Sequence, residues 1–243
     1  MRVTRYPWDH FPPLTIHADE TDVKNHPSYA EAKAGNPEAA FDLVRRFVSD
    51  PALAQLSQKY SAQQPVLVSA HAVETSGVNA IPQAMAEYLG SKLHWSVESS
   101  IVQTNVVGHT GADGFSRLAR QAEFDGSVSR HTCYVLVDDF IGQGGTLANL
   151  RGFLLHKGAQ VIGGTVLTGK PYSAILSNNE QQITQLREKH GPALESWWIN
   201  HFKFGYDCLT RSEARYLLNT PTVERIRDKI AQAVETGNFP DCA

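Results

Sequence analysis

The sequence predicts an α/β protein built on a parallel, twisted sheet flanked by helices, and three stretches carry this prediction. "PVLVSA" at 65–70 and "CYVLV" at 133–137 are short apolar runs typical of buried strands. Residues 146–157 carry leucines at helical spacing, Gly158 ends that helix, and "QVIGGTVL" follows as another strand. Because a strand, a helix and a strand with short links form a right-handed parallel crossover, we expect a parallel core over residues 65–170.

Helices are expected before this core. Residues 1–26 contain three prolines among scattered aromatics and indicate an irregular arm laid on the body. Residues 27–60 indicate helices with a break at Gly35 and Asn36, where proline follows at a first helical position. We therefore expect residues 1–64 to form an arm and a helical segment packed on the core.

The region after the core is mixed. "SWWINHFKF" has the aromatic content of a late strand. Thr210 and Glu213 have the spacing of a capping box at a helix start, and a last helix is expected to end before Gly237. Residues 65–243 are thus expected to form one main domain, with residues 171–243 as its C-terminal cover.

Composition narrows the class of protein. The chain of 243 residues is 42% hydrophobic and carries a net charge of −3, and nothing in this composition suggests the basic face that normally marks nucleic-acid binding. The three cysteines are far apart, which does not favour a disulfide framework or a cysteine zinc site. The first residues do not resemble a signal peptide, and no run of 18 apolar residues is present. We expect a cytoplasmic protein with no membrane contact.

The chemistry of the chain is predicted by "VLVDDFIGQGGT" at 135–146. In parallel sheets, ligands bind beyond the carboxyl ends of strands, and Asp138 and Asp139 are expected at such an end. The glycine-rich turn that follows leads directly into a helix, where backbone N–H groups and the helix dipole favour an anion.

Two common phosphate motifs are excluded by single positions. A P-loop needs lysine where this chain has Gly145, and a dinucleotide fingerprint needs a third glycine where it has Leu147. A ligand that combines a phosphate with vicinal sugar hydroxyls satisfies both the turn and the two carboxylates, because carboxylates accept strong hydrogen bonds from hydroxyls.

This stretch resembles the phosphoribosyl pyrophosphate (PRPP) motif of type I phosphoribosyltransferases, in particular their ComF-type subgroup. The resemblance implies that Asp138 and Asp139 hold the ribose hydroxyls, directly or through Mg²⁺, and are the catalytic residues. It implies that the 5′-phosphate is bound by Ile141, Gly142, Gln143, Gly144, Gly145 and Thr146. Gln143 departs from the pattern, because the family usually has threonine or serine there.

Other segments match the family more loosely. Ser76, Gly77 and Asn79 resemble the RGxN stretch of the ComF-type subgroup, with Ser76 where the family has arginine. The resemblance implies a pyrophosphate side formed by Glu74, Thr75, Ser76 and Gly77. Glu74 is expected to act there through Mg²⁺. In the place of the family's flexible loop, Arg117 and Arg120 are candidates for neutralising pyrophosphate, with His109 as a weaker one. The alternative is that both arginines lie on a solvated helix.

The acceptor side is less defined. Lys170 follows the strand after the motif, where purine-specific members use a lysine to recognise the base, although such a lysine is often only solvent-exposed. An aromatic ring among residues 197–204 is a candidate for base stacking, with a core position as the alternative.

We therefore expect a Mg²⁺-dependent transferase that moves phosphoribosyl from PRPP to an unknown nitrogenous acceptor. Two alternatives remain open at this stage: a PRPP or nucleotide sensor without turnover, and an interaction module whose terminal helices bind a partner. A homodimer is also left open.

Overall fold

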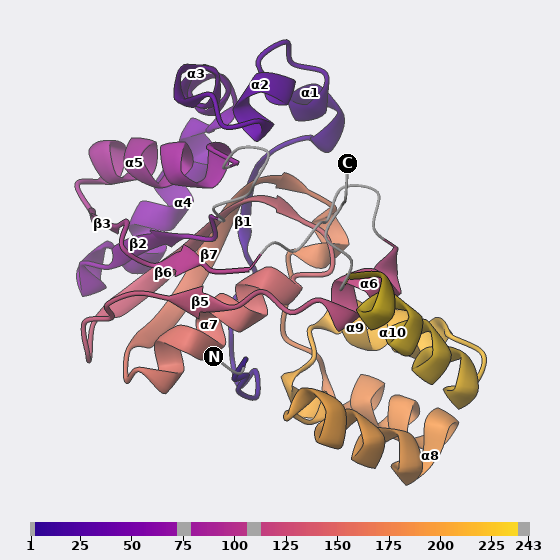
Figure 1. The fold of residues 1–243 in the computed structure, drawn as a ribbon. Coiled ribbons are helices and arrows are strands. Elements are labelled where there is room, and N and C mark those ends of the chain that lie inside the picture. Colours follow the sequence, from indigo (N-terminus) through magenta and orange to yellow (C-terminus); the bar gives the residue numbers. More distant parts are fainter. Residues whose placement is uncertain (1–2, 72–78, 106–112, 238–243) are drawn as a thin grey trace.

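The computed structural model describes residues 3–71, 79–105 and 113–237. Its centre is a parallel sheet in the order β1-β7-β6-β2-β3 (Figure 1). The five strands are β1 Thr15–Ala18, β2 Val66–Ser69, β3 Ser96–Glu98, β6 Cys133–Ile141 and β7 Gln160–Gly169. A separate antiparallel ribbon joins β4 Val102–Gln103 to β5 Phe124–Asp125. The predicted α/β class with a parallel sheet is confirmed.

Helices surround the sheet and extend beyond it. They are α1 Glu20–Lys24, α2 Tyr29–Lys33, α3 Pro37–Phe47, α4 Asp50–Tyr60, α5 Ile81–Leu93, α6 Gly114–Ala119, α7 Gly145–His156, α8 Glu180–Phe202, α9 Arg211–Asn219 and α10 Val223–Gly237. Short 3₁₀ turns lie at Ser61–Gln63, Pro171–Ser173 and Tyr206–Cys208. The expected additional helices at both ends of the core are therefore present.

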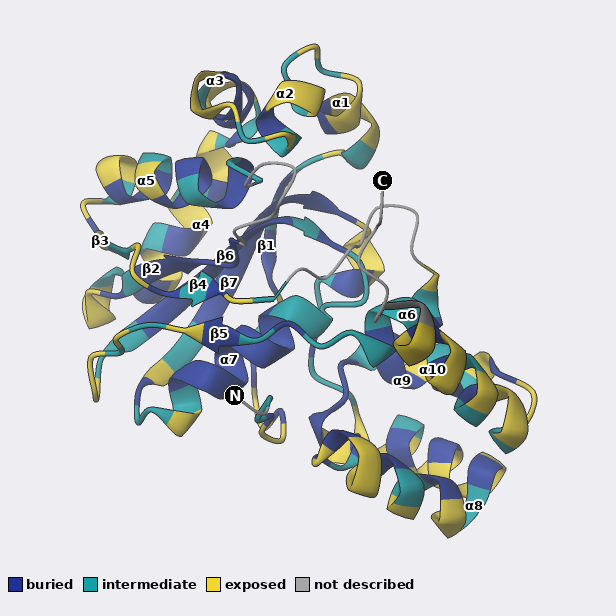
Figure 2. Cartoon of the chain, in the orientation of Figure 1, coloured by how far each residue is buried: buried dark blue, intermediate teal, exposed yellow. Residues whose placement is uncertain are grey.

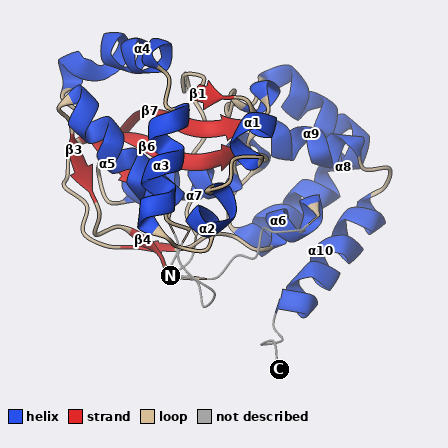
Figure 3. Cartoon of the chain, turned by 90° about the horizontal axis from the view of Figure 1, so that it is seen from above, coloured by secondary structure: helices blue, strands red, loops and turns tan. Residues whose placement is uncertain are grey.

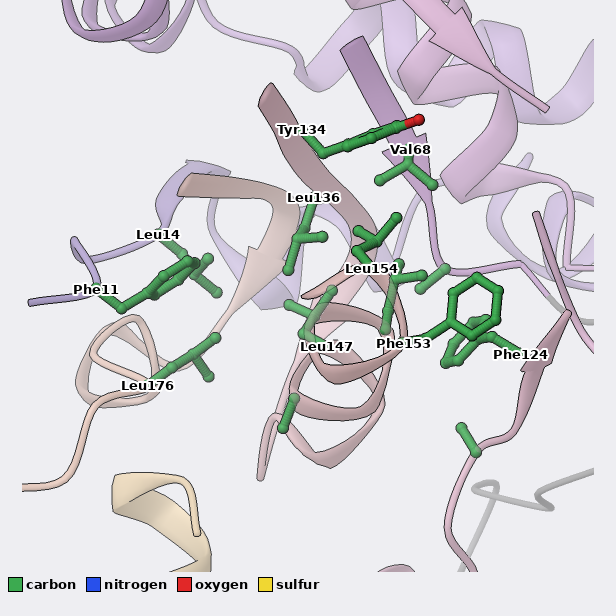
Figure 4. Close-up of a cluster of buried hydrophobic side chains, with 14 of the residues drawn as sticks. Phe11, Leu14, Val68, Phe124, Tyr134, Leu136, Leu147, Phe153, Leu154 and Leu176 are labelled. Atoms are coloured by element: carbon green, nitrogen blue, oxygen red, sulfur yellow. The ribbon is translucent and has the colours of Figure 1, made fainter. Parts of the chain in front are cut away.

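Alternation along β6 divides the core between the two faces of the sheet. Val135 and Val137 pack with α3, α4 and α5, whereas Tyr134 and Leu136 pack with α7, the N-terminal arm and β5 (Figure 4). Successive strand side chains point to opposite faces, and here both faces are covered, so β6 reads as a continuous apolar run. Figure 2 shows the resulting buried layer between the two helical layers.

The N-terminal arm contributes an edge strand that the sequence interpretation of residues 1–26 missed. β1 pairs with β7, with Thr15 opposite Thr165, and its burial alternates. Four residues are too few for a clear period-2 signal, so only the partner strand defines it. The arm also crosses α7 closely at Gly152, where a Cβ atom would lie 1.8 Å from the carbonyl oxygen of Thr4.

The C-terminal helices form a third cluster beside the sheet. α8, α9 and α10 lie together with α6 (Figure 3). The side chain of Trp198 is fully buried in the cluster that these helices share. The predicted strand at "SWWINHFKF" is wrong, because residues through Phe202 belong to α8. Leu194, Trp198 and Phe202 are buried at i, i+4 and i+8, which is a helical spacing that the aromatic content concealed. The predicted capping box of Thr210 and Glu213 is confirmed at the start of α9.

No helix among the described residues is long and apolar enough to cross a bilayer.

Candidate functional site

The acidic pair lies in the last third of β6. Ser69 ends β2 opposite Val137, whereas β6 continues to Ile141 alongside β7. Asp138 and Asp139 therefore lie just beyond the end of one neighbouring strand. Their exposures are only 9% and 8%. The prediction placed them at the strand's end; the structure places them within the strand, at the point where the sheet opens on one side.

The two carboxyl groups are electrostatically unlike. Burial, followed by the charge of Asp139, raises the pKa of Asp138 well above its ordinary value. The Asp138 carboxyl also accepts a hydrogen bond from the backbone N–H of Asp139 at 2.8 Å. Asp138 thus keeps its proton to a higher pH than an exposed aspartate and can donate a hydrogen bond in that form.

Asp139 is held in the ionised form. Burial alone would raise its pKa, but the Lys33 ammonium outweighs that effect and the net pKa is lowered. The Nζ atom of Lys33 lies 2.9 Å from Oδ2 of Asp139. The side chain of Asn79, which precedes α5, is a further hydrogen-bond partner of Asp139. Residues from α2, β6 and the start of α5 therefore meet at one carboxylate.

The glycine-rich turn follows the pair and opens α7. Gly144 is the N-cap with φ +81°, a left-handed conformation that favours glycine. Cβ atoms at Gly144 and Gly145 would lie 2.4 Å from Leu176 and 2.8 Å from the Glu213 carboxylate, so the turn is in close contact with the C-terminal region. Thr210 donates a 2.6 Å hydrogen bond to the carbonyl oxygen of Gln143. The strand, turn and helix expected of an anion-binding turn are present.

The turn rests on an ion pair that the sequence interpretation did not anticipate. Arg5 and Glu213 lie 2.7 Å apart, and each side chain is 1% exposed. Arg5 also donates to Asn149 of α7 at 2.6 Å and to Gln121 at 2.8 Å. The pair joins the arm, α7 and α9 beneath Gly145. Sequence carries no signal for it, since the two residues are 208 positions apart.

The remaining predicted site residues lie in different places in the structure. Arg117 reaches the turn, because its Nη1 atom would lie 3.1 Å from a Cβ built on Gly142. Arg120 is the C-cap of the same short helix, α6. Lys170 follows β7 and pairs with Glu20 of α1 at 2.7 Å. Glu74, Thr75, Ser76, Gly77 and His109 lie outside the described residues.

The aromatic candidates at 197–204 belong to the C-terminal cluster. Trp198, Phe202 and Phe204 are buried in its interior. Trp197 is partly buried, stacked on His201 and covered by Arg227. The three buried rings therefore occupy core positions, which was the alternative to a role in base stacking.

Within the described ranges, no group of three His, Cys, Asp or Glu side chains could hold a metal ion. Oδ2 of Asp139 already faces an ammonium. Magnesium usually binds through one or two carboxylates together with substrate phosphates, and substrate oxygens would have to supply most of its ligands here.

Taken together, fold and site define a parallel α/β protein with a buried acidic pair and a glycine turn at a helix start. No family model matches the sequence. The chain is 39% identical over 232 residues to a curated Escherichia coli protein named Protein TraN, covering 96% of this chain and 52% of that protein. It is 40% identical over 149 residues to an uncharacterized protein of Haemophilus influenzae, covering 61% and 33%. The chain thus spans about half or less of the length of these curated relatives.

Solved structures with a similar arrangement include two phosphoribosyltransferases. A hypoxanthine phosphoribosyltransferase from Staphylococcus aureus aligns with a TM-score of 0.35 and 16% identity, over 61% of this chain and 75% of that one. An adenine phosphoribosyltransferase from Leishmania donovani aligns with a TM-score of 0.35 and 12% identity, over 69% and 76%. Similarity at this level leaves the activity to be argued from the site.

Proposed function

We propose that this chain binds PRPP and transfers its phosphoribosyl group to a nitrogenous acceptor, with release of pyrophosphate. The observation that carries the proposal is the buried pair Asp138 and Asp139, followed at once by a glycine turn that opens α7. Two carboxyl groups serve the ribose hydroxyls, and the helix start serves the 5′-phosphate.

In the proposed reaction, the bond between ribose C1′ and the pyrophosphate oxygen breaks, and the oxygen keeps the electron pair. The acceptor nitrogen forms the new bond to C1′ through its lone pair, and the proton that this nitrogen carries is released to the departing pyrophosphate or to water. The transition state carries positive charge on the ribose, and the ionised Asp139, bound to the ribose hydroxyls, would stabilise that charge. Mg²⁺, held mainly by substrate oxygens, would offset charge on the pyrophosphate.

Other residues are assigned by position. Backbone N–H groups of residues 142–146 would bind the phosphate, and Arg117 would offset its charge from the side of Gly142. Glu74, Thr75, Ser76 and Gly77 remain proposed for the pyrophosphate side, with Arg120. Lys170 remains proposed for the acceptor side, where it would first have to leave Glu20.

The test is the double variant Asp138→Asn with Asp139→Asn. We expect it to fold and to lose PRPP binding in calorimetry with Mg²⁺ by about 100-fold. The charge-assisted hydrogen bond from ribose to Asp139 contributes about 1.5–3 kcal/mol, and the bond to Asp138 contributes about 0.5–1.5 kcal/mol. Asp228→Asn, an exposed change on α10, is the control and should bind as the wild type does. Unaltered PRPP affinity in the double variant would contradict the proposal.

A second function, PRPP sensing without turnover, has specific support at the turn. Gln143 replaces the family's hydroxyl residue, its Oε1 atom is buried without a hydrogen-bond partner among the described residues, and Thr210 holds its carbonyl. The decisive measurement is pyrophosphate release across a panel of nucleobases. PRPP binding without any release would select the sensor over the transferase.

A further inference from the structure

A lysine of the chain, Lys33, supplies a positive charge beside the acidic pair. Lys33 ends α2, and its side chain is 38% exposed while that of Asp139 is 10% exposed. The preceding residue, Ala32, is fully buried, and its carbonyl accepts a 3.1 Å hydrogen bond from the backbone N–H of Ala80 at the start of α5. The backbone that carries Lys33 is therefore fixed to the core beside the pair.

Neighbouring lysines on the same edge of the sheet are engaged elsewhere. Lys24 of α1 lies over the Phe140 ring at 4.7 Å and pairs with Glu20 at 2.6 Å. Lys170 pairs with the same glutamate. Of the ion pairs between described residues, that of Lys33 is the one that reaches the acidic pair. The contact is thus specific to one side chain.

We propose that Lys33 is the resident counter-charge of this site: it positions Asp139 for the ribose and occupies the place of a divalent cation on that carboxylate. The part that concerns ribose rests on the proposed function. With Lys33 at Oδ2 and Asn79 as a further partner, a doubly charged ion at Asp139 would lie beside an ammonium and be repelled.

The charge of Lys33 reduces the electrostatic repulsion between the site and an anionic ligand. Two ionised carboxylates would repel the phosphates of PRPP, whereas one ionised carboxylate matched by an ammonium does not. A ribose hydroxyl would share the Asp139 carboxylate with Lys33 and Asn79. Any Mg²⁺ then enters with the pyrophosphate and not through the protein.

The first test needs no substrate. Binding of Mn²⁺ is measured by electron paramagnetic resonance on wild type, Lys33→Met, Lys33→Arg and the matched control Lys24→Met. We expect Lys33→Met to gain about one Mn²⁺ site that the added change Asp139→Asn removes. Wild type, Lys33→Arg and Lys24→Met should lack it. A wild-type Mn²⁺ site that depends on Asp139, or no gain in Lys33→Met and in Lys33→Gln, would overturn the proposal.

The second test uses PRPP with Mg²⁺ in calorimetry. We expect Lys33→Met to weaken binding about tenfold, Lys33→Arg to restore most of it, and Lys24→Met to bind as wild type. Full PRPP affinity in a folded Lys33→Met would refute the positioning role. If the wild type itself does not bind PRPP, the proposed function fails, and the Mn²⁺ measurement still decides the role of Lys33.

Discussion

At the scale of single residues, Asp138 makes the stability of the fold fall as the pH rises above the ordinary pKa of an aspartate. A carboxyl group with a raised pKa favours the folded state below its ordinary pKa, and that contribution is lost as the pH rises through the folded value. A buried titratable group kept at a cost to stability beside a glycine turn is typical of a functional site.

This predicts that Asp138→Asn stabilises the protein at neutral and alkaline pH. The asparagine oxygen can still accept the hydrogen bond from the N–H of Asp139, but the side chain has no charge to bury. Near pH 4 the two proteins should melt alike, and towards pH 8 the variant should melt a few degrees higher, since about 1 kcal/mol corresponds to roughly 2–4 °C for a domain of this size. Thermal unfolding by circular dichroism across this range measures it; a variant that is less stable at pH 8 than wild type would contradict the assignment.

At the scale of elements, the edge strand β1 is attached through a buried histidine. The imidazole of His17 lies 2.9 Å from the hydroxyl of Thr165 on β7 and accepts a hydrogen bond from the backbone N–H of Ser49 before α4. Burial lowers the pKa of His17 to about 4. The strand that leads into α1, and so towards the acidic pair, is therefore held by a neutral ring.

Acid should loosen this attachment. In the unfolded chain His17 takes up a proton near pH 6.5 but in the fold only near pH 4, so stability falls as pH falls between these values, by up to about 3 kcal/mol. Urea unfolding at several pH values should show this slope in wild type and in the control His10→Gln, an exposed change. His17→Gln should be less stable at pH 7 but should lack that part of the slope. An equal slope in His17→Gln would refute the role of this ring.

At the scale of the whole molecule, the C-terminal helices are tied to the sheet domain through Arg5 and Glu213. The guanidinium bonds both carboxylate oxygens, at 2.7 and 3.1 Å, and lies 4.6 Å from the centre of the Phe204 ring. One side chain of the arm thus connects β6–α7 to the C-terminal cluster. A buried pair of this kind is costly to break, because either partner alone is an uncompensated buried charge.

Arg5→Met should therefore reduce the free energy of unfolding by about 3–5 kcal/mol. Adding Glu213→Gln removes the buried carboxylate charge that Arg5→Met leaves unpaired, and should restore part of the lost free energy of unfolding. The side-chain oxygen of the glutamine can still cap α9. Equilibrium urea unfolding of the two single variants and the double variant gives the coupling energy. Additive losses in the double variant would show that the two residues act independently.

The sequence by itself determined the local pieces of this protein. The apolar strand, the two aspartates, the glycine turn and the helix that follows are contiguous in 135–157, so their order and geometry follow from short-range rules. The prediction of an α/β fold with a parallel sheet followed from the same pattern. Residues 194–202 show its limit, because aromatic content there outweighed a helical spacing in the interpretation.

Only the tertiary structure decided what surrounds those pieces. Lys33 meets Asp139 across 106 positions, and Arg5 meets Glu213 across 208. Such contacts depend on where α2, β1 and α9 are placed by packing, and no local pattern encodes that placement. The sequence predicted two carboxylates beside a turn that binds an anion. The fold pairs one of them with a lysine and raises the pKa of the other by burial.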